Sequence, residues 1–251
     1  LVCRSQAAPE RLVVELSLGR TMLDLQRYEV LSFDCYGTLI DWESGILSAL
    51  REVVTAHGVK LGDAQILELY AELEPQAEQP PYKLYREVLE EVVLGFGERL
   101  RFVPSAAERA YLHTSLPNWP PFSDTVEALA ALARRYRLAA ISNTDDGLFA
   151  ATAIRLQTHF DWVITAQQVG AYKPAQAMFK QALRRIGLPR DRILHVAEST
   201  FHDIAPARAM GIATVWVNRS QGRVAASRRT DAVPDLEVPD LKALAALAGV
   251  M

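Results

Sequence analysis

Four short groups of polar residues follow apolar segments of the chain, and their side chains have the chemistry that a hydrolytic site needs. The first is Asp34, which comes directly after the strand-like segment 30–33 and is followed by a turn at Gly37 and Thr38. A carboxylate at the carboxyl end of a buried strand, followed by a glycine turn, is typical of the reactive edge of an open α/β sheet. We therefore take Asp34 as the candidate nucleophile.

The other three groups each follow a later segment that is predicted to be a strand; they are Ser142–Asn143, Lys173–Pro174, and Glu198 with Asp203. Parallel strands place their carboxyl ends at one edge of a sheet, so these side chains are expected to converge on Asp34. A lysine there would keep a carboxylate ionised, and Ser142 with nearby backbone N–H groups could donate hydrogen bonds to the anionic part of a substrate. The two later acids could position a water, neutralise the lysine or bind a divalent cation.

Each of these groups also has a purely structural interpretation. Ser142–Asn143 could be a turn, Lys173 could lie in a solvated loop, and Asp203 could cap the helix that follows it. Their occurrence together, in this order and each behind a predicted strand, favours one common site.

The elements that must position these groups fall into two patterns. Residues 45–117 show only helical periodicity, with helices predicted around 46–57, 64–73, 82–93 and 106–113, and Pro80–Pro81 interrupting them. A unit without strands cannot belong to a sheet layer. We therefore predict that residues 45–117 form a helical cap inserted after the first strand.

From residue 118 onward, strand and helix patterns alternate. The predicted strands are 138–141, 162–165, 193–197 and 214–217, the predicted helices are 125–135, 147–158, 174–186 and 203–210, and residues 235–247 supply a short strand and a closing helix. Short connections between alternating elements predict a parallel sheet with helices on both faces. The predicted fold is an α/β core made of residues 28–44 and 118–251, with the cap between them.

Composition excludes several classes of function. The chain has 251 residues, a net charge of −3 and no long basic run, so no nucleic-acid partner is predicted. No apolar run reaches the roughly 18 residues that would span a bilayer. Cys3 and Cys35 do not suggest a disulfide framework, so we expect a cytoplasmic protein. A homodimer is compatible with the sequence, and a small molecule is the expected substrate.

Residues 1–27 match neither pattern. They lack the order of a secretory signal, and the first methionine is Met22. We expect residues 1–27 to be a loosely held extension and the functional chain to begin near Met22, which deletion of residues 1–21 would test.

The four groups together resemble the ordered motifs of the haloacid dehalogenase superfamily of hydrolases. Asp34–Leu39 resembles the first motif, Ile141–Asn143 the second, Lys173–Pro174 the third, and Glu198–Asp203 the fourth. The resemblance implies a Rossmann-like three-layer core with an inserted helical cap, and a substrate bound between the two.

The residue two positions after the nucleophile indicates the reaction. Phosphatases of this superfamily resemble Asp-x-Asp, because an alkoxide leaving group needs a proton, whereas this chain has Tyr36, a poor acid near neutral pH. A halide leaves without a proton, and Asp-x-Tyr-Gly-Thr-Leu is similar to the type II 2-haloacid dehalogenases. The resemblance implies that Asp34 displaces the halide to give an ester. Water held by Asp203 then releases a 2-hydroxy acid, with no cofactor required.

The same resemblance implies roles for further residues. Thr38, Ser142, Asn143 and Lys173 would orient the nucleophile and the substrate carboxylate. Trp42, together with Tyr82, Tyr85 and Trp119, flanks the expected cleft and would either line an apolar pocket or pack core against cap.

Several positions depart from the dehalogenase pattern. The arginine that receives the halide in those enzymes has no counterpart between Arg51 and Arg86, so Arg86 is the substitute we expect, and their later tyrosine is replaced by Phe179. Glu198 and Thr200 stand where those enzymes have serine and asparagine. Asp34, Glu198 and Asp203 would form a hard-cation site. The alternative function is therefore Mg²⁺-dependent hydrolysis of a small phosphate ester through an aspartyl phosphate. A non-catalytic binding protein is a third hypothesis, against which the intact Asp34 and Lys173 argue.

Overall fold

The computed structural model describes residues 23–220 and 229–251. Within these ranges a six-stranded parallel sheet forms the centre of the core, in the order β3-β2-β1-β4-β5-β6. The strands are β1 (Val30–Phe33), β2 (Arg137–Ser142), β3 (Trp162–Thr165), β4 (Ile193–Ala197), β5 (Ala213–Val217) and β6 (Leu236–Val238). The chain leaves β1 towards β2 and β3 and later returns to the other side of β1 at β4. This switch point lies at the carboxyl ends of β1, β2 and β4, where open α/β sheets bind their ligands.

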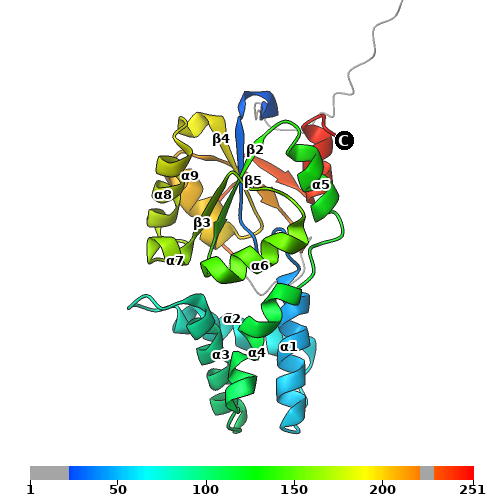
Figure 1. The fold of residues 1–251 in the computed structure, drawn as a ribbon, viewed down its shortest axis with the longest axis vertical. Helices are drawn as coiled ribbons and strands as arrows, with labels where there is room; N and C mark the ends of the chain where they lie inside the picture. The colour runs from blue at the N-terminus through cyan, green and yellow to red at the C-terminus, as the bar shows by residue number, and fades with distance from the viewer. Residues whose placement is uncertain (1–22, 221–228) are drawn as a thin grey trace, which may run out of the picture.

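Helices cover both faces of the sheet (Figure 1). One face packs against α5 (Thr125–Leu132), α6 (Asp146–Leu156) and α10 (Leu241–Leu247), and the other packs against α8 (Gln176–Ile186) and α9 (Ala205–Ala209), with the short α7 (Ala166–Val169) beside them. The strands are buried on both sides because successive side chains alternate between two apolar layers, for example Leu31 and Val30. The predicted α/β fold class is confirmed.

The helical insert consists of four helices that lie at the carboxyl edge of the sheet (Figure 1). They are α1 (Trp42–Ala56), α2 (Asp63–Ala77), α3 (Tyr85–Leu100) and α4 (Ala106–Ser115). Each presents an apolar face to the others, as the buried Ile46 and Leu50 do on α1. The presence of a helical insert after β1 is confirmed.

Two cap helices are longer than their sequence pattern predicts. The second continues past the predicted end at Leu73, through Pro75, because Ala77 is still buried in the shared core. The third begins three residues later than predicted and runs past Val93 to Leu100, because the buried Phe96 extends its apolar face. Packing of buried side chains overrides the weak helix propensity of proline and glycine here.

The segment predicted as one helix over 203–210 is divided in the structure. A π-helical turn, Thr200–Ile204, precedes α9. The turn begins where the Ser199 hydroxyl accepts a hydrogen bond from the backbone N–H of His202, at 3.0 Å. The chain therefore starts to coil three residues earlier than predicted, and Asp203 lies inside the turn.

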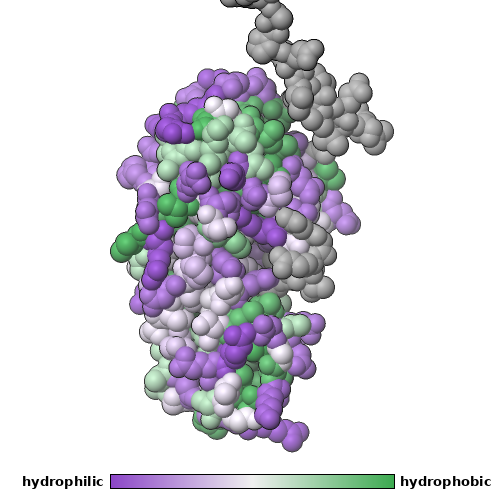
Figure 2. Space-filling model, turned by 90° about the vertical axis from the view of Figure 1, so that its right-hand side faces the viewer, coloured by the Kyte–Doolittle hydropathy of each residue, from purple (hydrophilic) through white to green (hydrophobic). Residues whose placement is uncertain are grey.

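The predicted extension falls mostly outside the described residues. Residues 1–22, with Cys3 and Met22, lie outside them, and Cys35 is a buried free thiol. Leu25, which was also predicted to belong to the extension, is buried against the core, and its carbonyl accepts a hydrogen bond from the Tyr136 hydroxyl. The face in Figure 2 mixes hydrophilic and hydrophobic side chains. In the part of the chain that the structure describes, no helix is long and apolar enough to cross a membrane.

Candidate active site

Asp34 lies just after β1 and is 7% exposed. The turn that follows it folds back, so that the Thr38 hydroxyl donates to Asp34 Oδ2 at 2.7 Å. Gly37 makes this turn possible in two ways. Its φ is +90°, and a Cβ there would lie 3.0 Å from Nε1 of Trp42. The local sequence therefore fixes both the position and one hydrogen bond of the candidate nucleophile.

Lys173 lies between two carboxylates. Its Nζ is 2.7 Å from Asp34 Oδ1, 2.7 Å from Asp203 Oδ1 and 2.9 Å from the carbonyl oxygen of Ile141. The side chain is almost completely buried. Its ammonium group can donate three hydrogen bonds, and all three acceptors are in place.

Asn143 holds the loop that carries Lys173. Its Oδ1 accepts from the Lys173 backbone N–H at 2.7 Å, and its Nδ2 donates to the Lys173 carbonyl at 3.1 Å. The sequence suggested a substrate-binding role for Asn143. In the structure its amide holds the backbone of the loop that carries Lys173, and the residue also contributes to the cavity wall.

Asp203 is held through one of its two carboxylate oxygens. Oδ1 accepts from Lys173 and from Nε2 of His195, the latter at 2.9 Å, whereas Oδ2 is buried and has no hydrogen-bond partner among the described residues. Burial alone would raise the pKa of Asp203, but the charge of Lys173 and the His195 hydrogen bond outweigh it and lower the pKa below its ordinary value. Asp203 therefore presents an ionised, unpaired oxygen.

The same buried surroundings have the opposite effect on the pKa of Asp34, the candidate nucleophile. Burial raises the pKa of Asp34 above its ordinary value of 3.8, the charge of Lys173 lowers it, and the charge of Asp203 raises it. For Lys173, burial lowers the pKa, but Asp203 and Asp34 together raise it above 10.5. The lysine is therefore a permanent cation at neutral pH, which favours the ionised form of both acids.

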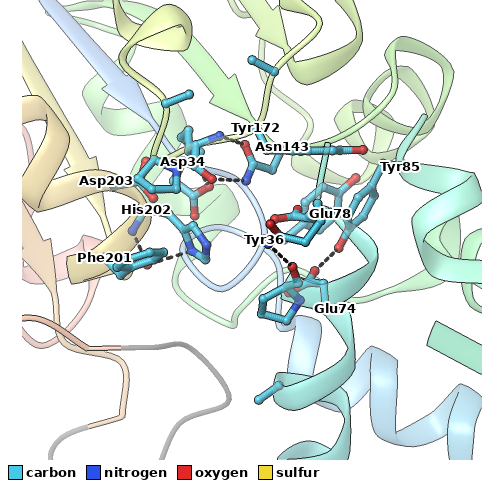
Figure 3. Close-up of a pocket in the computed structure, with 18 of the residues that line it drawn as sticks. Asp34, Tyr36, Glu74, Glu78, Tyr85, Asn143, Tyr172, Phe201, His202 and Asp203 are labelled. Atoms are coloured by element: carbon cyan, nitrogen blue, oxygen red, sulfur yellow. Dashed lines mark hydrogen bonds and ion pairs between the residues drawn. The ribbon is translucent and has the colours of Figure 1, made fainter. Parts of the chain in front are cut away.

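A cavity of about 900 Å³ lies between these residues and the cap. Figure 3 shows Asp34, Asp203 and His202 on one side of it, and Glu74, Glu78 and Tyr85 across from them on cap segments. The cavity reaches the candidate nucleophile directly, so a small molecule could contact Asp34 from the cap side.

Tyr36 and Trp42 both line this cavity, and the sequence predicted a position at the cleft for Trp42. The Tyr36 hydroxyl lies 2.9 Å from Oγ1 of Thr152, and burial raises the pKa of Tyr36 well above its ordinary value. Trp42 packs edge-on against Tyr70, with 5.8 Å between the ring centroids. Tyr36 is thus an even weaker acid than a free tyrosine.

Of the other candidates from the sequence, one lines the cavity and two do not. Glu198 lines the cavity, and its backbone N–H donates to the Thr38 hydroxyl at 2.9 Å. Ser142 is completely buried, and its Oγ has no hydrogen-bond partner in the ranges 23–220 and 229–251. Thr200 accepts from the backbone N–H of Thr230. Neither Ser142 nor Thr200 contributes to the described cavity wall.

Arg86 does not line the cavity. Its Nε lies 3.1 Å from Asp145 Oδ2, and the backbone N–H groups of Tyr85 and Arg86 donate to the same carboxylate at 2.7 and 3.1 Å. The guanidinium therefore helps an acid of the core to hold the first turn of α3. This position argues against the halide-binding role that the sequence suggested for Arg86.

Sequence reasoning missed the acidic side of the cap. Glu74 and Glu78 line the cavity from the last turns of α2. The Tyr70 and Tyr85 hydroxyls both donate to Glu74 Oε1, at 2.9 and 2.7 Å, and burial raises the pKa of Glu78 to about 9. The four-residue spacing of Glu74 and Glu78 could have placed both on one helical face. The helix was predicted to end at Leu73, so both residues lay outside it.

The proposed cation ligands Asp34, Glu198 and Asp203 do not form a metal site in this arrangement. In the part of the chain that the structure describes, no three His, Cys, Asp or Glu side chains are grouped so that they could hold a metal ion. The Lys173 ammonium already occupies the space between Asp34 and Asp203. As placed, these three carboxylates are not arranged around a common cation position.

Comparisons with known proteins agree with the fold and with the family that the motifs resemble. The family model for haloacid dehalogenase-like hydrolases matches residues 28–211. An (S)-2-haloacid dehalogenase of Pseudomonas sp. (strain YL) is 26% identical over 86% of this chain and 93% of its own length. A 5-amino-6-(5-phospho-D-ribitylamino)uracil phosphatase of Escherichia coli (strain K12) is 25% identical over 89% of this chain and 97% of its own length.

A solved structure has the same fold. The L-2-haloacid dehalogenase from Xanthobacter autotrophicus superposes with a TM-score of 0.74 at 21% sequence identity, over 89% of this chain and 99% of that one. Relatives that hydrolyse carbon–halogen bonds and relatives that hydrolyse phosphate esters therefore both resemble this chain at low identity.

Proposed function

Because the chain belongs to the family of haloacid dehalogenase-like hydrolases, we propose that it hydrolyses the carbon–halogen bond of a short 2-haloacid, with Asp34 as the nucleophile. The observation that carries this proposal is the state of Tyr36. Its hydroxyl is engaged with Thr152 and its pKa is raised, so it cannot efficiently protonate an alkoxide. A halide is a stable anion that leaves without a proton.

In the first step an Asp34 carboxylate oxygen attacks the carbon that bears the halogen. The new C–O bond forms as the carbon–halogen bond breaks, and the halide leaves with the bonding electron pair, giving an ester on Asp34. Thr38 and Lys173 orient the attacking carboxylate through their hydrogen bonds of 2.7 Å. The cation also favours the ionised nucleophile.

In the second step water attacks the carbonyl carbon of the Asp34 ester. Oδ2 of Asp203, which has no protein partner in the described ranges, accepts the proton of that water. The ester bond then breaks, the departing oxygen takes the proton back, and a 2-hydroxy acid and free Asp34 result. The overall products are the 2-hydroxy acid, halide and a proton.

Glu198 favours a second candidate function, the hydrolysis of a small phosphate ester. It lines the cavity together with Asp34 and Asp203, and the relatives of this chain include phosphatases. A phosphatase would need Asp34, Glu198 and Asp203 to come together around a Mg²⁺ ion, and it would need a proton donor other than Tyr36. Both requirements count against it.

One assay with two substrates separates the candidates. Halide release from chloroacetate and 2-chloropropionate, and phosphate release from p-nitrophenyl phosphate, are each measured with Mg²⁺ and with EDTA. We expect halide release that EDTA does not reduce. Phosphate release that EDTA abolishes, with no halide release, would replace the dehalogenase proposal with the phosphatase one.

The rate of halide release should fall at acid pH as Asp34 becomes protonated. Because burial raises the pKa of Asp34, the fall should begin above the pH at which an exposed aspartate titrates. Thr38→Val removes a hydrogen bond that lowers this pKa, so the acid limb of kcat/KM should move to higher pH, while Thr38→Ser should leave it near the wild-type position. If the acid limb of kcat/KM stays at the same pH in Thr38→Val, Asp34 is not the group that titrates.

Removing the Arg86 side chain should have little effect on halide binding. The guanidinium is half-exposed, and the buried Asp145 keeps the backbone N–H groups of Tyr85 and Arg86 as donors, so Arg86→Ala should lower stability only moderately and leave KM for 2-chloropropionate close to wild type. Inhibition by added bromide measures halide affinity directly. A large rise in KM together with loss of bromide inhibition would restore Arg86 as the halide-binding residue.

A further inference from the structure

Two polar residues lie side by side within an apolar layer of the core. Ser32 on β1 is paired in register with His195 on β4, and both are buried on the face that α8 covers. Their neighbours there include Val30, Met178 and Phe179. Placing two polar side chains among such neighbours costs free energy unless their hydrogen bonds are satisfied.

These two residues connect to the candidate site by a chain of hydrogen bonds. Ser32 Oγ lies 3.0 Å from His195 Nδ1, and His195 Nε2 lies 2.9 Å from Asp203 Oδ1. A carboxylate can only accept, so Nε2 must carry the hydrogen and donate it. The Phe179 ring stands edge-on to the imidazole, at 88° and 5.1 Å between centroids, which limits rotation of the histidine.

The effect of this chain is to fix the orientation of Asp203. Two donors, Lys173 and His195, reach the same oxygen, and the second oxygen is left buried without a partner in the described residues. With Lys173 alone, the carboxylate could rotate and offer either oxygen to the cation. With His195 as well, only Oδ2 remains for a water molecule.

We propose that His195 is a positioning residue for the hydrolysis of the ester intermediate, acting through its Nε2 hydrogen bond to Asp203. The inference rests on the proposed function, because it assigns His195 to the second of the two steps. Halide release requires Asp34 and Lys173 but no base, whereas attack of water requires a correctly oriented Asp203. Loss of His195 should therefore slow the second step and spare the first.

The test compares His195→Phe, which keeps an aromatic ring of similar size but removes both nitrogens, with His195→Gln, whose amide N–H can still reach Asp203. Rapid mixing with 2-chloropropionate measures the first halide released per site, and intact-protein mass spectrometry measures the ester on Asp34. For His195→Phe we expect a burst of one halide per site and an accumulated ester. The kcat should fall about 10- to 100-fold, as is common when a group that orients a functional side chain is lost. KM should also be lower than in the wild type. His195→Gln should recover part of the kcat.

Ser32→Ala is the matched control for disturbance of the buried pair. It removes the outer hydrogen bond but keeps the Nε2 contact, so it should retain more turnover than His195→Phe even if both variants melt at a similarly lowered temperature. A His195→Phe enzyme that loses burst and turnover equally, without accumulating ester, would overturn the inference, as would a His195→Gln enzyme no better than His195→Phe. Failure of the dehalogenase proposal has a different signature, because the wild-type enzyme would then release no halide at all.

Discussion

Replacing Asp34 by asparagine is expected to abolish hydrolysis of the substrate, with a fall in kcat on the order of 10⁴-fold or more, as for other catalytic nucleophiles. The amide has nearly the shape of the carboxylate and can still accept from Lys173, but it is not nucleophilic. Halide release and intact-protein mass measure the two consequences, no turnover and no ester. A variant within tenfold of wild type would exclude Asp34 as the nucleophile.

The folded state of Asp34→Asn provides the control for this experiment. One charge of the buried trio is removed, while the Lys173–Asp203 ion pair at 2.7 Å remains. Thermal unfolding should therefore be cooperative, with a melting temperature close to that of the wild type. Loss of activity in a well-folded variant then reports chemistry and not unfolding.

Lys173→Met is expected to give the largest loss of stability. Lys173 is 1% exposed and neutralises two buried carboxylates, so its removal leaves Asp34 and Asp203 facing each other without a cation. Breaking a buried ion pair by removing one partner costs about 3–5 kcal/mol. Urea denaturation measures this cost, and activity should also be lost because the pKa of Asp34 would rise further.

A second substitution separates charge from packing. The double variant Lys173→Met/Asp203→Asn lacks one of the two unpaired charges, so part of the lost stability should return. A double-mutant cycle then gives the coupling free energy between Lys173 and Asp203. Lys180→Met, on the exposed side of α8, is the matched control and should change the free energy of unfolding little. A double variant less stable than Lys173→Met alone would contradict the electrostatic explanation.

The strands were predicted well because their signal is local. The ranges of β1, β3 and β4 agree with the apolar segments 30–33, 162–165 and 193–197 in the sequence. The cap helices α2 and α3 were predicted too short. The parts beyond their predicted ends contain Pro75 and Gly95, and they remain helical because Ala77 and Phe96 pack in the cap core, which is a tertiary effect.

The candidate site was predicted in part, for a reason that concerns topology. The topology of a parallel sheet brings the loops after its strands together, so the convergence of Asp34, Lys173 and Asp203 follows from the order of the elements. The position of Arg86 and the contribution of Glu74 to the cavity depend on how the cap packs on the core. No pattern within a single segment carries that information.

The sequence by itself determined the order of the four motifs and the candidate nucleophile that follows β1. It also determined the tyrosine that disfavours a leaving group in need of a proton. Only the tertiary structure decided how the charges are shared. Lys173 is shared between Asp34, 139 positions away in the chain, and Asp203, and the His195 side chain on β4 donates to the same oxygen of Asp203. Such contacts arise from the spacing of the strands and the rotation of buried side chains, which are set by packing between segments and not by the residues next to each other in the chain.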